Sequence, residues 1–350
     1  MSYLDPRGGQ PSSGERSSPS GPSPYAAYWV PGQEVDATGE TEPVEPSWNA
    51  PTAATSTAEA EFELATGSSR PGRRRADAKV SGRAGRNLPA AIAVGLSLSL
   101  LVLASLVIWK PAFVGVIAAA AAVGIWEMTR AMRVTGAHPP LLPLIGGGLL
   151  ITGLAWYAGE DAVVLGLVVT VLAAVLWRLA DRPREIRQDF TASLLITVYV
   201  PFLLSFAVLL SAPDDGHLRV LVTLIAVILS DTGGYAAGVF LGKHPMAPSI
   251  SPKKSWEGFG GSVVAAAVGS AVLLFIWLDV AFYWGLLFGA VVSVVAVLGD
   301  LGESMLKRDL RIKDMSRLLP GHGGLMDRLD SILFAVPTAY LLLTLMAPPG

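Results

Sequence analysis

Residues 89–108 read PAAIAVGLSLSLLVLASLVI, a run without one charged side chain. About 20 apolar residues are enough for a helix to cross the hydrocarbon core of a bilayer. The run is continuously apolar and does not alternate with period two, which favours a helix over a strand. Backbone groups in lipid must be satisfied within the segment, so we expect a transmembrane helix here.

Comparable apolar runs follow this one to the end of the chain. We count nine: 89–108, 112–128, 141–158, 161–177, 191–211, 219–240, 258–278, 282–299 and 331–347. They predict an all-α, polytopic integral membrane protein with about nine transmembrane helices, forming one transmembrane domain over residues 89–350.

Composition agrees with a membrane protein. The 350 residues are 52% hydrophobic and 15% charged, with a mean hydropathy of +0.51. Soluble domains carry about 25% charged residues, so a wholly soluble protein is excluded. The absence of cysteine excludes disulfides, thiolate metal sites and cysteine nucleophiles. A net charge of −2 gives no overall basic field for nucleic acid, and we expect no nucleic-acid partner.

Residues 1–88 have a different character. They are rich in Pro, Gly, Ser and Glu and show no apolar period, so we expect a disordered tail. The tail ends in a basic block, residues 70–86, just before the first apolar run. A topology signal is the simpler interpretation of this block, and an anchor on the lipid surface is the alternative.

Lysine and arginine predict the orientation. With the N-terminus in the cytosol, the cytosolic connections hold nearly all of the remaining cations: Arg130, Arg133, Arg178, Arg182, Arg184, Arg187, Lys243, Lys253, Lys254, Lys307, Arg308, Arg311, Lys313, Arg317 and Arg328. The outside connections hold only Lys110 and Arg219. This bias follows the positive-inside rule and predicts a cytosolic N-terminus and a C-terminus outside.

Acidic residues gather at the predicted cytosolic side. Asp231 lies within the sixth run, Asp300 follows the eighth, Glu257 opens the seventh, and Asp327 and Asp330 precede the ninth. Charges at membrane depth are costly and usually functional. Glu127, which ends the second run, is by itself interpreted as an interfacial charge that reaches water.

The spacing of these acids suggests a metal site. If the eighth helix continues past Gly299, then Asp300, Glu303 and Lys307 share one face with Ser304, while Asp327, Asp330 and Ser331 share another. Carboxylates on two adjoining helix ends suit Mg²⁺, which typically binds one or two carboxylates plus substrate phosphates. The alternative, that these acids only pair with nearby lysines and arginines, stays open.

Basic and glycine-rich loops lie on the same side. Residues 251–258 read SPKKSWEG, and residues 320–324 read PGHGG. Glycines let backbone N–H groups approach a phosphate, and lysines neutralise it. Together with the acids, they predict a site for a polyphosphate and its metal.

The segment 304–330 resembles the signature of the phosphatidate cytidylyltransferase (CDP-diacylglycerol synthase) family. The matching pieces are Ser304 to Arg308, Lys313-Asp314 and Pro320 to Asp330, and upstream Asp231 to Tyr235 with Gly238 and Gly242-Lys243, Ser251 to Gly258 with Gly260-Gly261, and Gly299 to Leu301 with Glu303-Ser304. The resemblance spans roughly residues 89–347. Gly234 and Ser255 depart from it, where the family often has Ala and Thr.

The resemblance implies condensation of CTP with phosphatidic acid to give CDP-diacylglycerol and pyrophosphate, with Mg²⁺, in the bilayer of the plasma (inner) membrane. The metal ligands it suggests are Asp300, Asp327, Asp330 and Asp231. The catalytic candidates are Lys307, Arg308, Lys313, Asp314, His322 and Arg328. The substrate-binding candidates are Lys243, Ser251, Lys253, Lys254, Glu257, Gly323 and Gly324. A second cation and a homodimer remain open.

Two other classes compete with this interpretation. Polar residues between helices also mark transporters, but the acids here gather at one face instead of the midplane, and no inverted repeat is visible. A CTP-dependent polyprenol kinase is chemically closer, yet it lacks support from the 304–330 segment. The Asp-Gly-x-x-Ala-Arg motif of CDP-alcohol phosphotransferases does not occur.

Overall fold

The computed structural model describes residues 88–181, 186–319 and 323–348. The predicted tail, apart from Leu88, and the candidate residue His322 lie outside these ranges. The elements are α1 (Leu88–Ile108), α2 (Lys110–Met132), η1 (Arg133–Thr135), α3 (Leu141–Tyr157), α4 (Gly159–Asp181), α5 (Ile186–Thr197), η2 (Val198–Phe202), α6 (Leu203–Ser211), α7 (Gly216–Leu241), β1 (Pro245–Ala247), β2 (Ser251–Ser255), α8 (Trp256–Leu278), α9 (Phe282–Asp309) and α10 (Met326–Met346).

The predicted all-α fold is confirmed. Counting α5, η2 and α6 as one column, the described residues form nine helical columns, each matching one predicted run. Seven are long and apolar enough to cross a membrane. The described apolar part of α1, Ile92–Ile108, and α3 are shorter. Pro140 lies immediately before α3. Gly159, the first residue of α4, has a positive φ of 78° and lies at the turn between α3 and α4.

The fifth column contains an irregularity at its proline. Pro201 lies inside the π-helical segment η2 and has no N–H to donate, so the α-helical bonding pattern cannot continue through it. The wider turn of η2 accommodates this loss and leads directly into α6. The sequence analysis did not predict this segment.

Helices adjacent in sequence pack in series, from α7 on α8 through α8 on α9 to α9 on α10. Glycines bring α7 and α8 close together: a Cβ on Gly233 would lie 2.7 Å from the carbonyl oxygen of Gly261, and a Cβ on Gly261 would lie 2.7 Å from that of Gly233. In the first half of the chain, α2 packs on α3 and α3 on α4, and α6 packs on α10. Small residues at such contacts are typical of helix packing in membranes.

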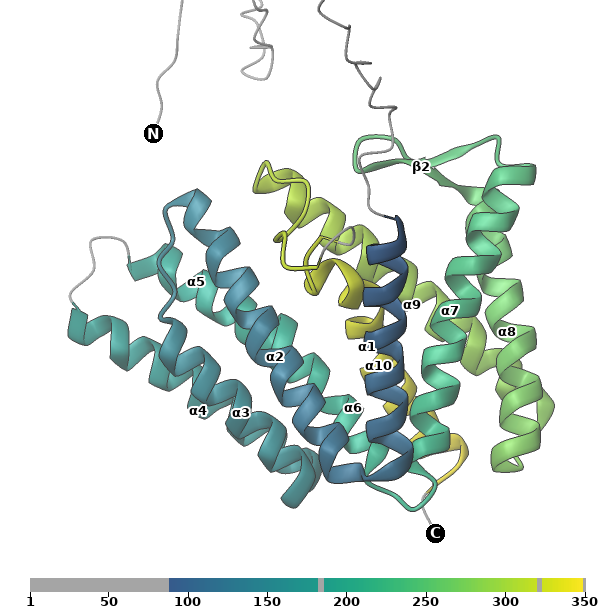
Figure 1. The fold of residues 1–350 in the computed structure, drawn as a ribbon, viewed down its shortest axis with the longest axis horizontal. Helices are drawn as coiled ribbons and strands as arrows, with labels where there is room; N and C mark the ends of the chain where they lie inside the picture. The colour runs from purple at the N-terminus through teal and green to yellow at the C-terminus, as the bar shows by residue number, and fades with distance from the viewer. Residues whose placement is uncertain (1–87, 182–185, 320–322, 349–350) are drawn as a thin grey trace, which may run out of the picture. The chain divides into compact units, whose positions relative to one another are not determined.

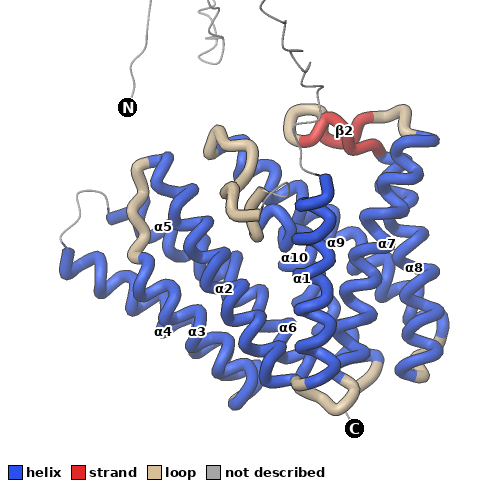
Figure 2. Tube along the Cα trace, viewed as in Figure 1, coloured by secondary structure: helices blue, strands red, loops and turns tan. Residues whose placement is uncertain are grey.

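The only strands among the described residues form a short hairpin, β1–β2, between α7 and α8 (Figure 2). Pro245 pairs with Ser255, and Ala247 pairs with Ser251. We had expected a basic loop at this position. Ser255 also caps α8, because its hydroxyl accepts the N–H of Gly258 at 3.1 Å. We call this side of the bundle the hairpin end.

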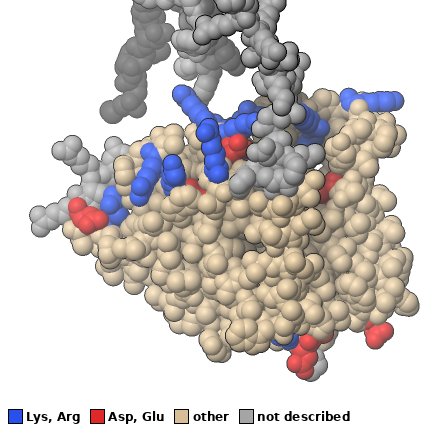
Figure 3. Space-filling view, viewed as in Figure 1, with Lys and Arg blue, Asp and Glu red and all other residues tan. Residues whose placement is uncertain are grey.

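Charged side chains lie mainly at the two ends of the bundle, and few lie on its flank. In Figure 3, lysines and arginines gather along the hairpin end, and the flank below it is almost free of charge. The flank exposes large apolar side chains such as Leu100, Leu172 and Phe275. Such a surface is typical of helices that face lipid tails.

Candidate active site

A cavity of about 240 Å³ opens beside the hairpin, between α7, α8 and α9. Asp231 of α7, Lys253 and Lys254 of β2, and Asp300 of α9 line it, together with Ser331 of α10. The cavity thus brings together acidic and basic residues from three separate stretches of sequence, and a serine from a fourth. A second cavity, of about 280 Å³, lies at the opposite end and is lined by Glu160, Arg219 and Tyr340 among others.

An ion pair crosses the first cavity. The Lys254 Nζ lies 2.5 Å from the Asp300 Oδ2. The hydroxyl of Ser304, one turn along α9, lies 3.5 Å from the other oxygen of this carboxylate. The helix therefore continues past Gly299, as the predicted polar face requires.

Glu257, a predicted substrate-binding residue, bonds within the chain. Its Oε2 accepts the backbone N–H groups of Lys243 at 3.1 Å and His244 at 3.2 Å. Its Oε1 lies 2.5 Å from the Nδ1 of the exposed His244 ring. These contacts fasten the base of the hairpin that carries Lys253 and Lys254.

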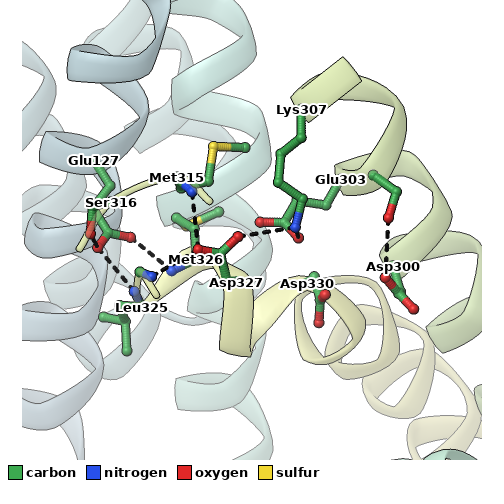
Figure 4. A network of polar contacts seen from close by, with 12 residues as sticks. Glu127, Asp300, Glu303, Lys307, Met315, Ser316, Leu325, Met326, Asp327 and Asp330 are labelled. Atoms are coloured by element: carbon green, nitrogen blue, oxygen red, sulfur yellow. Dashed lines mark hydrogen bonds and ion pairs between the residues drawn. The ribbon is translucent and has the colours of Figure 1, made fainter. Parts of the chain in front are cut away.

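A second polar group lies between α9 and α10 (Figure 4). The Lys307 Nζ donates to the Glu303 Oε2 at 2.6 Å and to the Asp327 Oδ1 at 3.0 Å. Glu303 is fully buried, and its Oε1 has no hydrogen-bond partner among the described residues. Lys307 thus pairs with nearby acids, as the alternative interpretation has it: it joins Glu303 of its own helix to Asp327 of α10, 20 residues further along the chain.

Asp327 also organises the backbone of the segment that precedes α10. Its Oδ2 accepts the N–H of Met315 at 3.0 Å and that of Gly324 at 2.8 Å. Gly323 has a φ of +83°, which favours glycine, and its N–H donates to the Leu319 carbonyl at 3.2 Å. Both glycine N–H groups therefore bond within the chain in this structure.

Three site residues were not named as ligand, catalytic or substrate-binding candidates, although the predicted polar face of the eighth helix includes Glu303. Glu303 is buried between Lys307 and the charge of Asp330. Tyr199 is buried in η2, has no partner for its hydroxyl among the described residues, and lies within electrostatic reach of Glu303, Asp330 and Asp300. Glu127 is fully buried, so interpreting it as an interfacial charge that reaches water was wrong. Its backbone partners lie 198 and 199 residues away in sequence, and local spacing carries no signal for them.

The other predicted residues lie around these two groups. Asp330 is half-buried and accepts the N–H of Ser331 at 2.6 Å. The Arg308 Nε lies 3.4 Å from the carbonyl of Ile250, next to the half-buried Ser251. Exposed positions are Lys243, Lys253, Lys313, Asp314 and Arg328. Asp314 lies beside Gly323: a Cβ added to Gly323 would lie 3.5 Å from the Cβ of Asp314.

The acids fit an oxygen-preferring cation. Asp231, Asp300 and Asp330 lie close enough for their charges to interact, and the buried Glu303 Oε1 has no partner within the described part of the chain. Among the described residues, no three acidic or imidazole side chains lie close enough to form a complete metal site by themselves. Mg²⁺ usually takes only one or two carboxylates and completes its shell with phosphate and water, so this donor set is sufficient.

Comparison with known proteins gives one consistent result. A model of the cytidylyltransferase family matches residues 89–346. A phosphatidate cytidylyltransferase of Mycobacterium bovis is 42% identical over 288 residues, which cover 79% of this chain and 94% of the relative. The same-named protein of Mycobacterium leprae is 42% identical, covering 78% and 92%. That of Staphylococcus saprophyticus is 34% identical over 200 residues, covering 56% and 76%.

Proposed function

The chain belongs to the phosphatidate cytidylyltransferase family, and from that premise we propose that the cavity at its hairpin end joins CTP to phosphatidate. A phosphate oxygen of phosphatidate attacks the α-phosphorus of CTP. The bond from that phosphorus to the β-phosphate bridging oxygen breaks, and pyrophosphate leaves with its electron pair. The products are CDP-diacylglycerol and pyrophosphate.

One observation carries the placement of this reaction: Lys254 and Asp300, on two different elements, face each other across the cavity. The attacking phosphate is already an anion near neutral pH, so it needs no strong base. The barrier arises because two anions must approach each other. Positioned cations and a metal lower such a barrier by electrostatic stabilisation.

Mg²⁺ is the proposed cofactor. Asp300 is its first candidate ligand, with Asp327, Asp330 and Asp231 as the others. When bound, the metal neutralises phosphate charge and orients the oxygens around the reacting phosphorus. Asp327 is the least available of the four for this task, because both of its oxygens accept hydrogen bonds from the chain.

The chain's own cations perform the remaining work. Lys253 and Lys254 line the cavity and hold CTP phosphates there. Lys243, Arg308, Lys313 and Arg328 are assigned to neutralising the triphosphate and the lipid headgroup, and so is His322, which lies outside the described residues. Ser251, Gly323 and Gly324 stay assigned to substrate binding and Asp314 to catalysis, and Glu257 keeps the hairpin in place.

We also propose the orientation. The described connections at the opposite end carry only the cations Lys110 and Arg219, and the hairpin end carries the others. The positive-inside rule then assigns the hairpin end to the cytosol, where CTP is made, and the C-terminus to the outside of the plasma membrane. Phosphatidate reaches the cavity from the bilayer.

The test uses detergent-purified full chain with α-³²P-CTP, phosphatidate and Mg²⁺. Labelled, organic-extractable CDP-diacylglycerol is expected, and it should vanish with EDTA and in Asp300→Asn. Asp309→Asn is the matched control, because this exposed acid lies on the same helix outside the cavity. Full activity in Asp300→Asn overturns the metal assignment. Folded wild-type protein without labelled lipid overturns the activity, and γ-labelled CTP with a polyprenol then tests the kinase alternative.

A further inference from the structure

Glu127 holds together both ends of the segment 316–326. Its Oε1 accepts the hydroxyl of Ser316 at 2.5 Å and the N–H of Leu325 at 2.9 Å. Its Oε2 accepts the N–H of Met326, the first residue of α10, at 2.8 Å. Figure 4 shows the side chain reaching from α2 into this segment.

The contact is favourable despite the cost of burying a charge. An isolated buried carboxylate is strongly destabilised, but one with several hydrogen-bond donors is not. Two of the donors are backbone N–H groups at the start of α10, where the helix dipole also favours a negative charge. Glu127 thus fixes where α10 begins.

Glycines allow the close approach. A Cβ on Gly324 would lie 2.9 Å from both carboxylate oxygens of Glu127 and 3.1 Å from the Asp327 Oδ2. A Cβ on Gly124, one turn before Glu127, would lie 2.9 Å from the Met326 sulfur. Gly324 therefore lies between two carboxylates, one from α2 and one from α10.

The start of α10 carries three residues of the proposed site: Asp327, Arg328 and Asp330. We propose that Glu127 is a positioning residue for the transferase reaction: it sets the place of these side chains by holding the hydroxyl of Ser316 and the backbone N–H groups of Leu325 and Met326. This inference rests on the proposed function. In this role Glu127 acts through these three contacts, without touching substrate.

The first half of the chain thereby contributes to a site built from its second half. Among the helix contacts, α2 meets α10 at few positions. Glu127 adds two hydrogen bonds at the start of α10 and a third to Ser316 in the segment before it. Loss of these bonds frees the start of α10 without removing any side chain from the cavity. The expected signature is a fall in kcat larger than any rise in the KM for CTP.

The experiment uses the absence of cysteine from the chain. Leu318→Cys introduces one thiol at a position that is 47% exposed, and a nitroxide spin label on it reports the mobility of the segment. Glu127→Gln keeps the size and one acceptor oxygen but turns an N–H₂ group toward a backbone N–H. We expect increased label mobility and a kcat reduced about tenfold or more.

Asp189→Asn is the matched control. This carboxylate is also buried, and it accepts the N–H of His138 at 2.5 Å and the Nε of Arg178 at 3.0 Å, away from the cavity. The Asp189→Asn variant should have a lower thermal stability, but its label mobility and kcat should stay near those of the labelled parent. Glu127→Ala should exceed Glu127→Gln in both effects if it folds.

Three outcomes overturn the inference: unchanged mobility and kcat in Glu127→Gln, raised mobility with unchanged kcat, and an equal loss of kcat in Asp189→Asn. Failure of the proposed function is distinguishable from these, because the labelled parent itself would then make no CDP-diacylglycerol. The mobility measurement needs no turnover and still tests whether Glu127 holds the segment.

Discussion

Lys254 on β2 and Asp300 on α9 form an ion pair across the cavity, with 2.5 Å between the Nζ and Oδ2 atoms. Each side chain is therefore the ion-pair partner of the other. We expect a nucleotide with its metal to replace this pairing, because phosphate would attract the lysine and the metal would attract the carboxylate.

Replacing Lys254 tests this exchange. Lys254→Gln removes a cation that faces the phosphates, and the KM for CTP should rise about tenfold, as for loss of one charge-assisted contact. Steady-state kinetics at saturating Mg²⁺ measure it. Arg133→Gln, which removes an exposed hairpin-end cation outside the cavity, is the control. A KM equal to that of wild type would show that Lys254 does not bind CTP.

Gly324 should not tolerate a side chain. In Gly324→Ala, the added methyl group would lie 2.9 Å from both carboxylate oxygens of Glu127 and 3.1 Å from the Oδ2 of Asp327. These buried carboxylates have little room to move. We expect at least a tenfold loss of CDP-diacylglycerol synthesis. Gly302→Ala is the control, because its methyl group meets no atom within 4 Å and alanine favours the helix. Equal activity of the two variants would contradict the crowding described here.

Tyr199 gives a prediction that separates stability from activity. Its buried hydroxyl has no partner among the described residues, and an unsatisfied buried hydroxyl costs about 1–3 kcal/mol. Tyr199→Phe should therefore keep or raise the melting temperature. If the hydroxyl bonds to substrate in the loaded enzyme, turnover falls at the same time. Wild-type turnover in this variant would restrict Tyr199 to packing, for instance against Phe334.

At the opposite end, a pH dependence is expected from Asp215, which lies between α6 and α7. The Arg219 guanidinium donates to it at 2.8 Å and holds the pKa of its carboxyl below the usual value. This contribution to stability is complete above the unfolded-state pKa of about 3.9 and is lost as the pH falls through the folded-state pKa.

Asp215→Asn should therefore melt at a lower temperature than wild type near pH 7, and the difference between the two melting temperatures should shrink as the pH falls below about 3.9. Thermal unfolding in detergent across this range measures the effect. Asp214→Asn, an exposed neighbour, should follow wild type throughout. A difference that does not shrink at all below about pH 3.9 would mean that the variant loses something other than the ionised carboxylate.

The helices were predictable because each apolar run is long. Lysines and arginines also gather in every second connection between the runs, which supports the number of helices. The polar face of α9 was predictable too, since three- and four-residue spacing fixes it locally. Partners across helices were not. Lys307 was assigned to phosphate. Its bond to Glu303 lies within the predicted face of α9, and only the packing of α9 against α10 shows its bond to Asp327.

Other features depended on tertiary contacts in the same way. The SPKK stretch has no alternating pattern, and it becomes a strand because the antiparallel segment Pro245–Ala247 lies beside it. Glu127 is an ordinary acid at a helix end until α10 starts next to it. The roles of the individual residues in binding and catalysis remain predictions, and the variants above test them.

Helix α3 has one further consequence. Its 17 residues span about 25 Å at 1.5 Å per residue, several ångströms less than the usual hydrocarbon thickness of about 30 Å. Leu142 and Leu149 are exposed along it. If α3 crosses the bilayer as predicted, the surrounding lipid has to thin locally or leave polar groups in contact with acyl chains, and both carry an elastic cost. We therefore expect the stability of this protein to depend on the acyl-chain length of the host membrane as well as on its headgroups.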